Sequence, residues 1–491
     1  MEPRIQNREQ LLATGNRAGH RAALDIIEAG LQGADPYHNT RKLLHLAGDR
    51  LTVGGRYFEP AGDPQSGSAV FDLSKIKRIY VLGAGKGIQR VAQAIEDTLG
   101  KRLTGGHVID KKGHPVTCRR IGVTLGAHPV PDDDCVRGSQ KILEMARNLG
   151  PDDLVFTCAG NGVSSLLTLP APGVSLEDVK KTTYLMQVMR GAPTLELNAV
   201  RNHIDILKSG RLARRIQPAR AVHIISIDPG SYQWLIEENY WLHNLPDSTT
   251  FAQAVANLKK RDAWDEAPAS VREFLLRADP DYETVKAAEF NRMAPWRAFG
   301  VMPQDRPGSF LKAAMSKARE LGFTPHLLTR DLFAMEATAA ANYATSIARE
   351  IERYGRPFAP PCALFSGGEM VVTVGKSQGV GGRNQEYALA AARWIAGSPD
   401  IVAASVDTDG TDGPGFQFRS KDKDSDMPQC LAGGIVDGYS WESAQQAGLK
   451  PLEELKAHNT SPLLWKVNSG IAAAPGISLN DLTVVLVGRP A

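Results

Sequence analysis

The order of apolar and polar segments predicts an α/β protein with two domains, the first built on a mostly parallel, Rossmann-like sheet. Short apolar runs alternate with longer segments of helical periodicity, which is the pattern of right-handed βαβ units. Several of the apolar runs end in glycine-rich loops. Between about residues 229 and 310 the periodicity weakens and tryptophans accumulate. We therefore expect an N-terminal domain over residues 1–295 and a smaller C-terminal α/β domain over residues 310–491.

The N-terminal part of the chain contains the first set of expected elements. Residues 9–50 have the apolar spacing of two amphipathic helices. Further helices are expected over residues 88–99 and 132–149, and the second of them begins at three aspartates, a residue type that favours helix N-termini. Strands are expected at residues 78–82, 121–125, 154–158 and 222–227.

The C-terminal part resumes the same alternation. A helix is expected over residues 336–354. Apolar strand candidates stand at residues 326–328, 363–365, 370–374, 401–406 and 482–487. A charged, turn-rich insertion from Gly415 to Gln429 separates two glycine-rich stretches, and we expect it to be an exposed, poorly ordered loop.

Charge and cysteine content restrict the class of protein. With 57 basic and 54 acidic residues the net charge is only +3, which argues against nucleic acid or an anionic membrane as a partner. The five cysteines are scattered and odd in number, so a reducing compartment is expected. The first 15 residues lack a secretory signal, and no run approaches the roughly 20 apolar residues of a membrane span. We expect a cytoplasmic protein and leave a homo-oligomer open.

The first loop of chemical interest is Gly83-Ala-Gly85-Lys86-Gly87, after a strand and before a helix. Glycines let a ligand approach the backbone, and a helix N-terminus favours an anion. A dinucleotide fingerprint would need glycine at position 88, where Ile88 stands, so NAD is not expected. Lys86 is suited to a phosphate or carboxylate, and the alternative is a tight turn with a solvated lysine.

The second loop is Gly160-Asn161-Gly162-Val163-Ser164-Ser165. Its hydroxyl groups and backbone N–H groups, directly after a strand, suggest a cradle for an anion. Val163 brings a β-branched side chain where close approach of a ligand would favour glycine. A simple turn with a serine N-cap is the alternative.

The third and fourth loops are in the C-terminal part. Ser366-Gly-Gly-Glu369 is followed by Gly379-Val-Gly-Gly-Arg383-Asn-Gln-Glu386, in which one arginine among glycines suits a bidentate grip on a carboxylate or phosphate. The fourth loop contains Asp409 and Asp412, which could hold Mg²⁺ through water or form ordinary Asp-Gly turns.

Two further patterns do not support a site. Val374-Gly-Lys-Ser377 ends like a Walker A motif, but the first glycine of that motif would fall at Met370. The scattered His107, His114, Cys118 and His128 lack the spacing of zinc ligands, so zinc is not expected.

Taken together, the loops are similar to those of the type II glycerate 2-kinase family, the MOFRL-domain proteins, some of which carry an older label of hydroxypyruvate reductase. The matching segments run in order along nearly the whole chain: Val81-Leu-Gly-Ala-Gly-Lys86, His128-Pro-Val-Pro-Asp132, Glu196-Leu-Asn-Ala-Val-Arg201, Ser366-Gly-Gly-Glu369, Gly381-Gly-Arg-Asn-Gln-Glu386 and Thr408-Asp-Gly-Thr-Asp-Gly413.

The resemblance implies a fold, a reaction and a set of site residues. It implies a larger N-terminal α/β domain, a smaller C-terminal MOFRL domain and an active site in the cleft between them. It also implies transfer of the ATP γ-phosphoryl group to the 2-hydroxyl of D-glycerate, with Mg²⁺. By position, Lys86 and Arg383 match the two basic residues thought to act there. The residues expected to bind substrate or phosphate are Gly85, Asn161, Gly162, Ser164, Ser165, Arg201 and Glu386.

Several loops depart from the pattern of the family. Where the family has Ser-Gly-Gly-Gly-Ser, this chain has Gly160-Asn-Gly-Val-Ser164. Where the family has Ser-Asp-x-x-Gly-Asp, this chain has Ser226-Ile-Asp-Pro-Gly-Ser231, so at least one acidic residue is gone. The Arg-Lys-His-Leu-Ser segment is Arg201-Asn-His-Ile-Asp205, and a bulky stretch at Trp241-Leu-His-Asn-Leu245 replaces a small one. A lost Gly-Gly-Gly is expected to block close approach of phosphate, and lost acids to weaken a metal site.

These departures leave alternatives to a kinase open. One is an enzyme of another class, such as a lyase, isomerase or hydrolase, acting on a polyhydroxy or keto acid. The candidates for proton transfer are then His128, His203 and His243, although no spacing selects among them. Another is a protein that binds a small anion without turnover. A dehydrogenase is disfavoured by Ile88.

Overall fold

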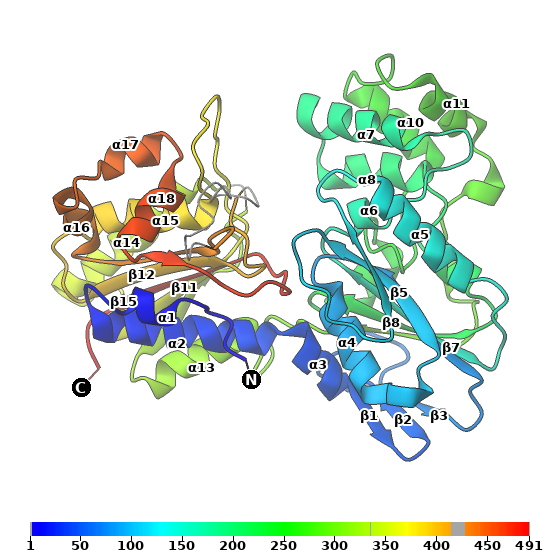
Figure 1. Ribbon diagram of the computed structural model, residues 1–491, viewed down its shortest axis with the longest axis horizontal. Coiled ribbons are helices and arrows are strands. Elements are labelled where there is room, and N and C mark those ends of the chain that lie inside the picture. The colour runs from blue at the N-terminus through cyan, green and yellow to red at the C-terminus, as the bar shows by residue number, and fades with distance from the viewer. Residues whose placement is uncertain (1, 334, 414–427, 491) are drawn as a thin grey trace. The chain divides into compact units, whose positions relative to one another are not determined.

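The computed structural model describes residues 2–333, 335–413 and 428–490. The chain forms two compact units, which are Pro36–Pro303 (the central unit) and Met1–Asp35 with Gln304–Ala491 (the terminal unit), as Figure 1 shows. Most of the predicted insertion, residues 415–427, lies outside the described residues. Among the described residues, no helix combines the length and the apolar composition needed to cross a membrane.

The central unit is built on a six-stranded sheet in the order β6-β5-β4-β7-β8-β9, and every neighbouring pair is parallel. This confirms the parallel sheet that the sequence predicts. The strands are β4 (Arg78–Ala84), β5 (Gly105–Lys111), β6 (Gly122–Gly126), β7 (Asp153–Gly160), β8 (Arg220–Ser226) and β9 (Trp296–Gly300). Because parallel strands end at one edge, the loops after β4 and β7 are neighbours.

Two strands of this sheet were not expected from the sequence. β5 contains the polar His107 and Asp110, which lie buried, so it has no apolar run. His107 lies 2.8 Å from Thr124 Oγ1, and Asp110 accepts a hydrogen bond of 2.8 Å from the N–H of Gly87. Such hydrogen bonds offset the cost of burying polar groups. β9 is short and lies in the segment of weak periodicity.

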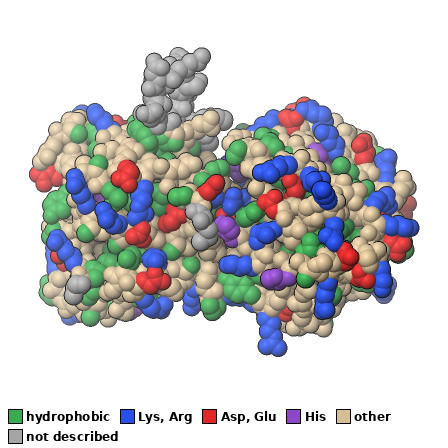
Figure 2. Space-filling model, turned by 60° about the horizontal axis from the view of Figure 1, so that its bottom comes forward, with side chains coloured by type: hydrophobic (Ala, Val, Ile, Leu, Met, Phe, Trp, Pro, Cys, Tyr) green, Lys and Arg blue, Asp and Glu red, His purple; other side chains and the backbone are tan. Residues whose placement is uncertain are grey.

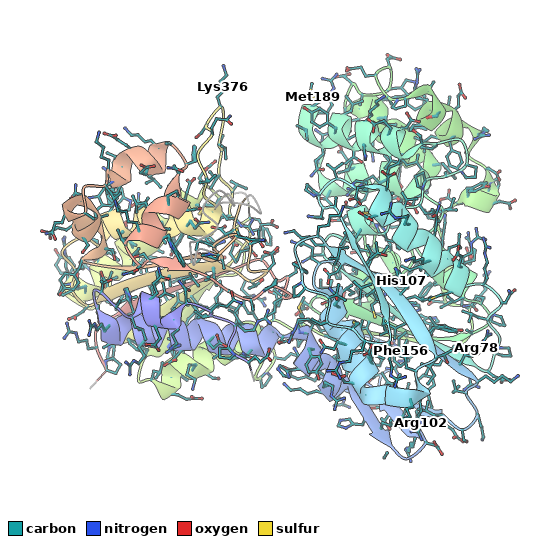
Figure 3. All side chains as sticks on the ribbon, in the orientation of Figure 1. Arg78, Arg102, His107, Phe156, Met189 and Lys376 are labelled. Carbon is teal, nitrogen blue, oxygen red and sulfur yellow. The ribbon has the colours of Figure 1, made fainter. Side chains whose placement is uncertain are left out.

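Helices cover the sheet, and a second helical layer has its own core. The elements next to the sheet include α3 (Pro36–Leu43), α4 (Ile88–Leu99), α5 (Asp133–Met145), α6 (Val163–Leu166) and α9 (Arg211–Arg215). The Asp132 side chain accepts a hydrogen bond from Cys135 N and caps α5, as predicted. The second layer contains α7 (Leu176–Tyr184), α8 (Thr194–His203), α10 (Phe251–Lys260) and α11 (Ala269–Arg277) around Phe251 and Phe274. In Figure 3 the labelled Met189 lies on this layer and Phe156 lies on β7.

Part of the predicted N-terminal helical region is wrong. Residues 44–53 form a hairpin of β1 (Leu44–Ala47) and β2 (Arg50–Val53), which pairs with β3 (Ala69–Asp72). Leu44, Leu51 and Val53 are buried in the core, and the residues between them are not. This alternation of period two is that of a half-buried strand.

The terminal unit contains a mixed sheet in the order β10-β11-β15-β12-β13-β14. Only β10 and β11 are parallel, and the other pairs are antiparallel. The strands are β10 (Thr324–Thr329), β11 (Cys362–Gly368), β12 (Ile401–Asp407), β13 (Gly433–Asp437), β14 (Gly470–Ile471) and β15 (Asp481–Val487). The helices α14 (Ala337–Tyr354) and α15 (Arg383–Trp394) pack on this sheet through small alanine side chains.

The strand predicted at residues 370–374 is wrong. This segment has only an isolated bridge between Val371 and Glu336. The N–H of Met370 donates to a carboxylate oxygen of Asp481 at 3.0 Å, so it is not available to a sheet partner. The segment is therefore a connection rather than a strand.

The N-terminal helix α2 (Arg17–Ala34) belongs to the terminal unit, which differs from the division at residue 295 drawn from the sequence. It packs against α13 (Phe310–Glu320), and a Cβ at Gly30 would stand 3.1 Å from Leu482 of β15 and 3.3 Å from Ala314 of α13. The amphipathic pattern predicts which face of α2 is buried, but not which part of the chain covers it.

A buried contact between a histidine and a carboxylate attaches this helix to the sheet. His20 Nε2 lies 3.2 Å from a carboxylate oxygen of Asp437, and both side chains are almost fully buried. Burial by itself would raise the pKa of Asp437, but the hydrogen bonds from His20 and from the N–H of Asn16 lower it to about 2.

We expect Asp437→Asn to reduce the stability of the protein above pH 4 and to matter less as the pH falls. The folded state holds this carboxyl ionised, so its stabilisation is complete above the unfolded pKa and is lost as the pH falls towards about 2. Urea unfolding of both proteins over this range measures the difference. A difference that stays constant with pH would contradict the assignment of the effect to this carboxyl.

Candidate functional site

Two glycine loops contact each other at the carboxyl edge of the central sheet. The N–H of Lys86 donates to the carbonyl oxygen of Asn161 at 2.7 Å. Gly85 has a φ of +156°, and a Cβ there would stand 2.8 Å from the nitrogen of Gly160. The first two loops predicted from the sequence therefore pack against each other through their backbones.

Lys86 and His128 lie beside this pair of loops. Gly162 has a φ of +79°, and a Cβ there would lie 3.0 Å from Lys86 Cγ and 3.0 Å from His128 Cδ2. The absence of that Cβ lets a lysine and an imidazole both approach the partly exposed Gly162. Of the three histidines that the sequence could not separate, His128 is the one that lies beside Lys86.

The altered loop does not have the obstruction that its sequence suggests. Val163 is the first residue of α6 and is 1% exposed, because its side chain packs in the core of the unit. Of the three family glycines, Gly162 remains, directly before Val163. The expectation that the β-branched residue would block an approaching phosphate is therefore wrong.

Ser164 and His243 form a hydrogen-bonded pair next to this loop. His243 Nε2 lies 2.9 Å from Ser164 Oγ, and the histidine is fully buried. Burial, followed by the nearby charges of Lys208, Arg201 and Arg211, lowers the pKa of His243 well below its usual value. The imidazole is therefore neutral at physiological pH and holds the hydroxyl in position. Both residues were candidates from the sequence, but their pairing was not visible there.

The structure gives His203 and Ser165 local structural contacts. His203 lies with Nδ1 2.7 Å from the carbonyl oxygen of Ala199 and Nε2 2.7 Å from Glu283. Ser165 Oγ donates to the carbonyl oxygen of Ala127 at 3.0 Å. Both ring nitrogens of His203 are thus occupied within the protein, which leaves none for proton transfer to a ligand.

Arg201 is a mostly buried cation in the same unit. Its Nε and Nη2 both donate to Asn198 Oδ1, at 3.1 and 2.5 Å. Burial lowers the pKa of Arg201 to about 10. Within the described part of the chain, no carboxylate forms an ion pair with it.

In the terminal unit, carboxylates surround Arg383 at the start of α15. Its Nε donates to both oxygens of Asp481 at 2.9 Å, its Nη2 donates to Asp407 at 2.8 Å, and Nη1 lies 3.7 Å from Glu369. Burial by itself would lower the pKa of Arg383, but Asp407 and Asp481 raise it. Much of the guanidinium fork that the sequence assigns to a ligand is used inside the unit. Asp481 and Asp407 had no signal in the sequence that linked them to Arg383.

The third and fourth loops pack together through Asp412. This fully buried carboxylate accepts hydrogen bonds from the backbone N–H groups of Asn384 and Gln385, at 3.1 and 2.9 Å. A Cβ at Gly382 would stand 2.4 Å from Asp412, so the glycine permits the contact. Asp412 therefore caps the first turn of α15, which differs from the metal ligand that the spacing suggested.

Asp409 and Glu386 also have partners within the unit. Asp409 Oδ1 accepts a hydrogen bond of 2.8 Å from the N–H of Thr411, as in an Asp turn. Glu386 lies 2.7 Å from His458 Nδ1. Across the described ranges, no group of three or more His, Cys, Asp or Glu residues could hold a metal ion. These residues do not fit a metal held by the protein alone.

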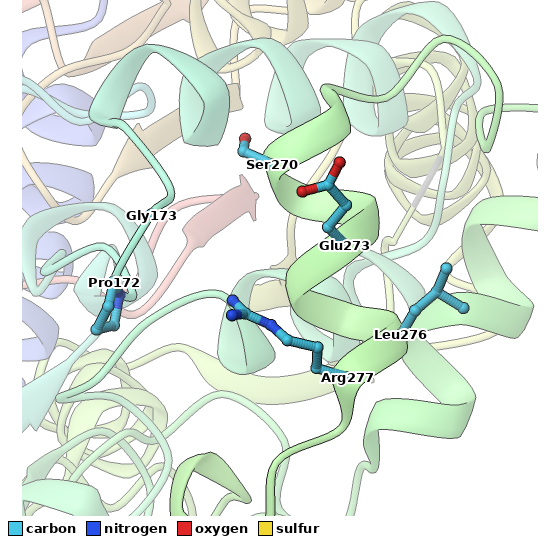
Figure 4. Close-up of a pocket in the computed structure, with 6 residues that line it drawn as sticks. All are labelled: Pro172, Gly173, Ser270, Glu273, Leu276 and Arg277. Carbon is cyan, nitrogen blue, oxygen red and sulfur yellow. The ribbon is translucent and has the colours of Figure 1, made fainter.

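A surface hollow of the central unit lies away from these loops. It has a volume of about 790 Å³ and is lined by Pro172, Gly173 and one face of α11 with Ser270, Glu273, Leu276 and Arg277 (Figure 4). None of these residues follows a sheet strand at its carboxyl end. On the face shown in Figure 2, basic and acidic side chains are interspersed. We therefore place the candidate site at the strand-edge loops and not at this hollow.

Comparison with known proteins gives matches along most of the chain. A family model described as "Domain of unknown function (DUF4147)" matches residues 22–276, and one described as "MOFRL family" matches residues 362–481. The glycerate 2-kinase of Pyrococcus horikoshii is 33% identical over 486 residues, which cover 95% of this chain and 98% of the relative. The D-glycerate 2-kinase of Thermotoga maritima is 33% identical over 421 residues, covering 84% and 91%.

Solved structures agree with these matches. A crystal structure of glycerate kinase from Thermotoga maritima has a TM-score of 0.72 and 29% identity, and the match covers 95% of this chain and 99% of that one. A crystal structure of a protein from Pyrococcus horikoshii has a TM-score of 0.70 and 30% identity, covering 97% and 99%.

Proposed function

The chain belongs to the type II glycerate 2-kinase family, and we propose from this that it transfers the γ-phosphoryl group of ATP to a hydroxyl group of a small hydroxy acid such as D-glycerate. Its relatives make it an enzyme of the glycerate-kinase type. No observation favours another enzyme class or a binding protein over a kinase.

The observation that carries the proposal is the pair of glycine loops, residues 83–87 and 160–165, that pack together beside Lys86. Phosphoryl transfer needs positioned positive charge more than covalent chemistry, since catalysis comes from orientation and charge stabilisation. Backbone N–H groups at glycine loops before helices suit phosphate oxygens. Asn161 and Gly162 are partly exposed there, and the partly exposed Lys86 supplies the charge.

The proposed roles follow from this placement. ATP supplies the phosphoryl group when it is bound, and its phosphates would lie against Gly85, Asn161 and Gly162. Lys86 would balance the charge that develops on the transferred group. His128, which lies beside Gly162, would accept the proton of the attacking hydroxyl.

Mg²⁺ is part of the proposal only as an ion that arrives with the nucleotide. Magnesium commonly keeps several waters and binds through one or two carboxylates together with substrate phosphates. The fully capped carboxylate of Asp412 and the turn at Asp409 do not form a protein cage for it.

We expect Lys86→Ala to lower kcat for phosphorylation of D-glycerate by about 10²–10³-fold, which is typical for removal of one charge-stabilising donor. Coupled detection of ADP with D-glycerate and ATP measures this. Lys101→Ala is the control, because Lys101 is an exposed lysine of the same unit, and it should keep full activity. Near-normal turnover by a folded Lys86→Ala protein would place the site elsewhere.

A further inference from the structure

Arg201 differs from the other buried cations around it because it lacks a charged partner or a set of carbonyl acceptors. Lys208 pairs with Asp205 at 2.6 Å, and Arg211 donates to the backbone carbonyl oxygens of Asn202, Lys208 and Tyr282. Among the described residues, Arg201 has only the amide oxygen of Asn198 as an acceptor. An uncompensated buried charge is costly, so its presence needs a reason.

A second unsatisfied donor stands next to it. Asn198 is 1% exposed, and its amide nitrogen has no hydrogen-bond acceptor among the described residues. Asn198 and Arg201 are three residues apart on α8, so their side chains share one face of the helix. A guanidinium and an amide N–H₂ are both hydrogen-bond donors, and together they suit an acceptor that carries negative charge.

This pair is connected to the strand-edge loops. The charge of Arg201 acts on His243, which contacts Ser164 of the glycine loop at 2.9 Å. A hydrogen bond also joins α8 to the segment that contains His243: the amide nitrogen of Asn202 donates to the carbonyl oxygen of Tyr240 at 2.9 Å. The unsatisfied donors are therefore close to the surface where phosphoryl transfer is proposed.

We propose that Arg201, with Asn198, is the receptor for the carboxylate of the acid substrate and so determines that the enzyme accepts an acid rather than a neutral polyol. This rests on the proposed function, because it names the group of the acceptor that the site recognises. Arg201 thereby gains the counter-ion that it lacks, and Asn198 gains an acceptor. The substrate carboxylate is then fixed at one end while its hydroxyl faces the transferred phosphoryl group.

A carboxylate fits the charge better than a nucleotide phosphate does. Lys208 has a carboxylate partner and Arg211 has three carbonyl acceptors, which leaves Arg201 as the cation of this cluster with a single amide oxygen. A single carboxylate matches one guanidinium in charge and in planar, bidentate geometry. A triphosphate would bring several charges to one cation.

The test uses thermal shift and steady-state kinetics of Arg201→Met and Arg201→Lys. D-glycerate alone should stabilise the wild type, while glycerol, which lacks the carboxylate, should not. Neither variant should respond to D-glycerate, and ADP should still stabilise both. The KM for D-glycerate should rise on the order of 10²-fold, as expected when one partner of a buried charge pair is removed, while the KM for ATP stays near its wild-type value.

A second readout separates a receptor from a structural arginine. Removing an uncompensated buried charge should raise the melting temperature of the ligand-free protein in Arg201→Met. Arg211→Met is the control, because Arg211 is a buried arginine of the same cluster that donates to three carbonyl groups, so its loss should lower the melting temperature.

The outcomes distinguish this inference from the proposed function. If Arg201→Met and Arg201→Lys still bind D-glycerate normally, the receptor is wrong even where the wild type is a kinase. If they lose ADP and keep D-glycerate, the site takes phosphate, which also overturns the inference. If the wild type binds D-glycerate through Arg201 but transfers no phosphoryl group to it, the receptor stands and the proposed function fails.

Discussion

Replacing Arg383 with methionine is expected to reduce the free energy of unfolding of the terminal unit by about 3–5 kcal/mol, the range seen when one partner of a buried ion pair is removed. Arg383 connects the carboxylates of Asp481 and Asp407 at 2.9 and 2.8 Å, at the ends of β15 and β12. Without the guanidinium, two poorly solvated negative charges would face each other across adjacent strands. Arg383→Lys should be intermediate, since one ammonium cannot reproduce the two-sided fork.

Hydrogen exchange at α15, together with urea unfolding, measures this effect. Arg393→Met is the control, because Arg393 lies on the same helix but is exposed and stacks on Trp394. It should change stability little. An Arg383→Met protein as stable as the control would mean that the ion pairs contribute nothing. A stable variant without kinase activity would restore the role in catalysis that the sequence assigns to Arg383.

The parallel sheet of the central unit could be predicted because its strands are buried on both faces. The segments that became β4, β7 and β8 read as continuous apolar runs, which is typical of parallel strands. β5 escaped prediction because His107 and Asp110 interrupt the run, and only tertiary hydrogen bonds make their burial tolerable. A local pattern carries no information about such distant partners.

The position of α2 shows a different limit. Its buried face is evident from Leu24, Ile27 and Leu31, all of which are at most 2% exposed. Its partner is α13, nearly 300 residues further along the chain, and no local signal specifies that pairing. For the same reason the contact between Arg383 and Asp481, which lie 98 residues apart in sequence, could not be predicted.

For the candidate site, the loops could be predicted but the use of their side chains could not. Glycines after strands stand where space is tight, beside the Gly160 backbone at Gly85 and beside the side chains of Lys86 and His128 at Gly162, and the predicted approach of a ligand there stays a prediction. Whether a polar side chain faces a ligand or the protein depends on its neighbours in space. Asp412 became a helix cap and Val163 a core residue, although the sequence suggested a metal ligand and an obstruction.

Asp205 is a further departure from the family pattern whose meaning appears only in the structure, and its replacement is the second change with a large expected effect. We expect Asp205→Ala to reduce the free energy of unfolding of the central unit by about 3–5 kcal/mol. Its carboxylate accepts hydrogen bonds from the N–H groups of Leu169 and Leu207, each at 2.8 Å, and from Lys208 Nζ at 2.6 Å. The alanine would leave these donors without an acceptor and Lys208 without a counter-ion inside the core.

Asp205→Asn separates the two contributions, because the amide oxygen can still accept from the backbone but no longer compensates Lys208. Its loss of stability should lie between those of the wild type and Asp205→Ala. Asp152→Ala is the control, since Asp152 pairs with Lys77 in the same unit with side chains that are 53% and 77% exposed. Exposed pairs of this kind contribute about 0–1 kcal/mol. Urea unfolding of the three variants measures these differences. If Asp205→Ala loses no more unfolding free energy than Asp152→Ala, Asp205 is not a structural counter-ion of Lys208. The presence of an aspartate where the family has serine would then need another cause.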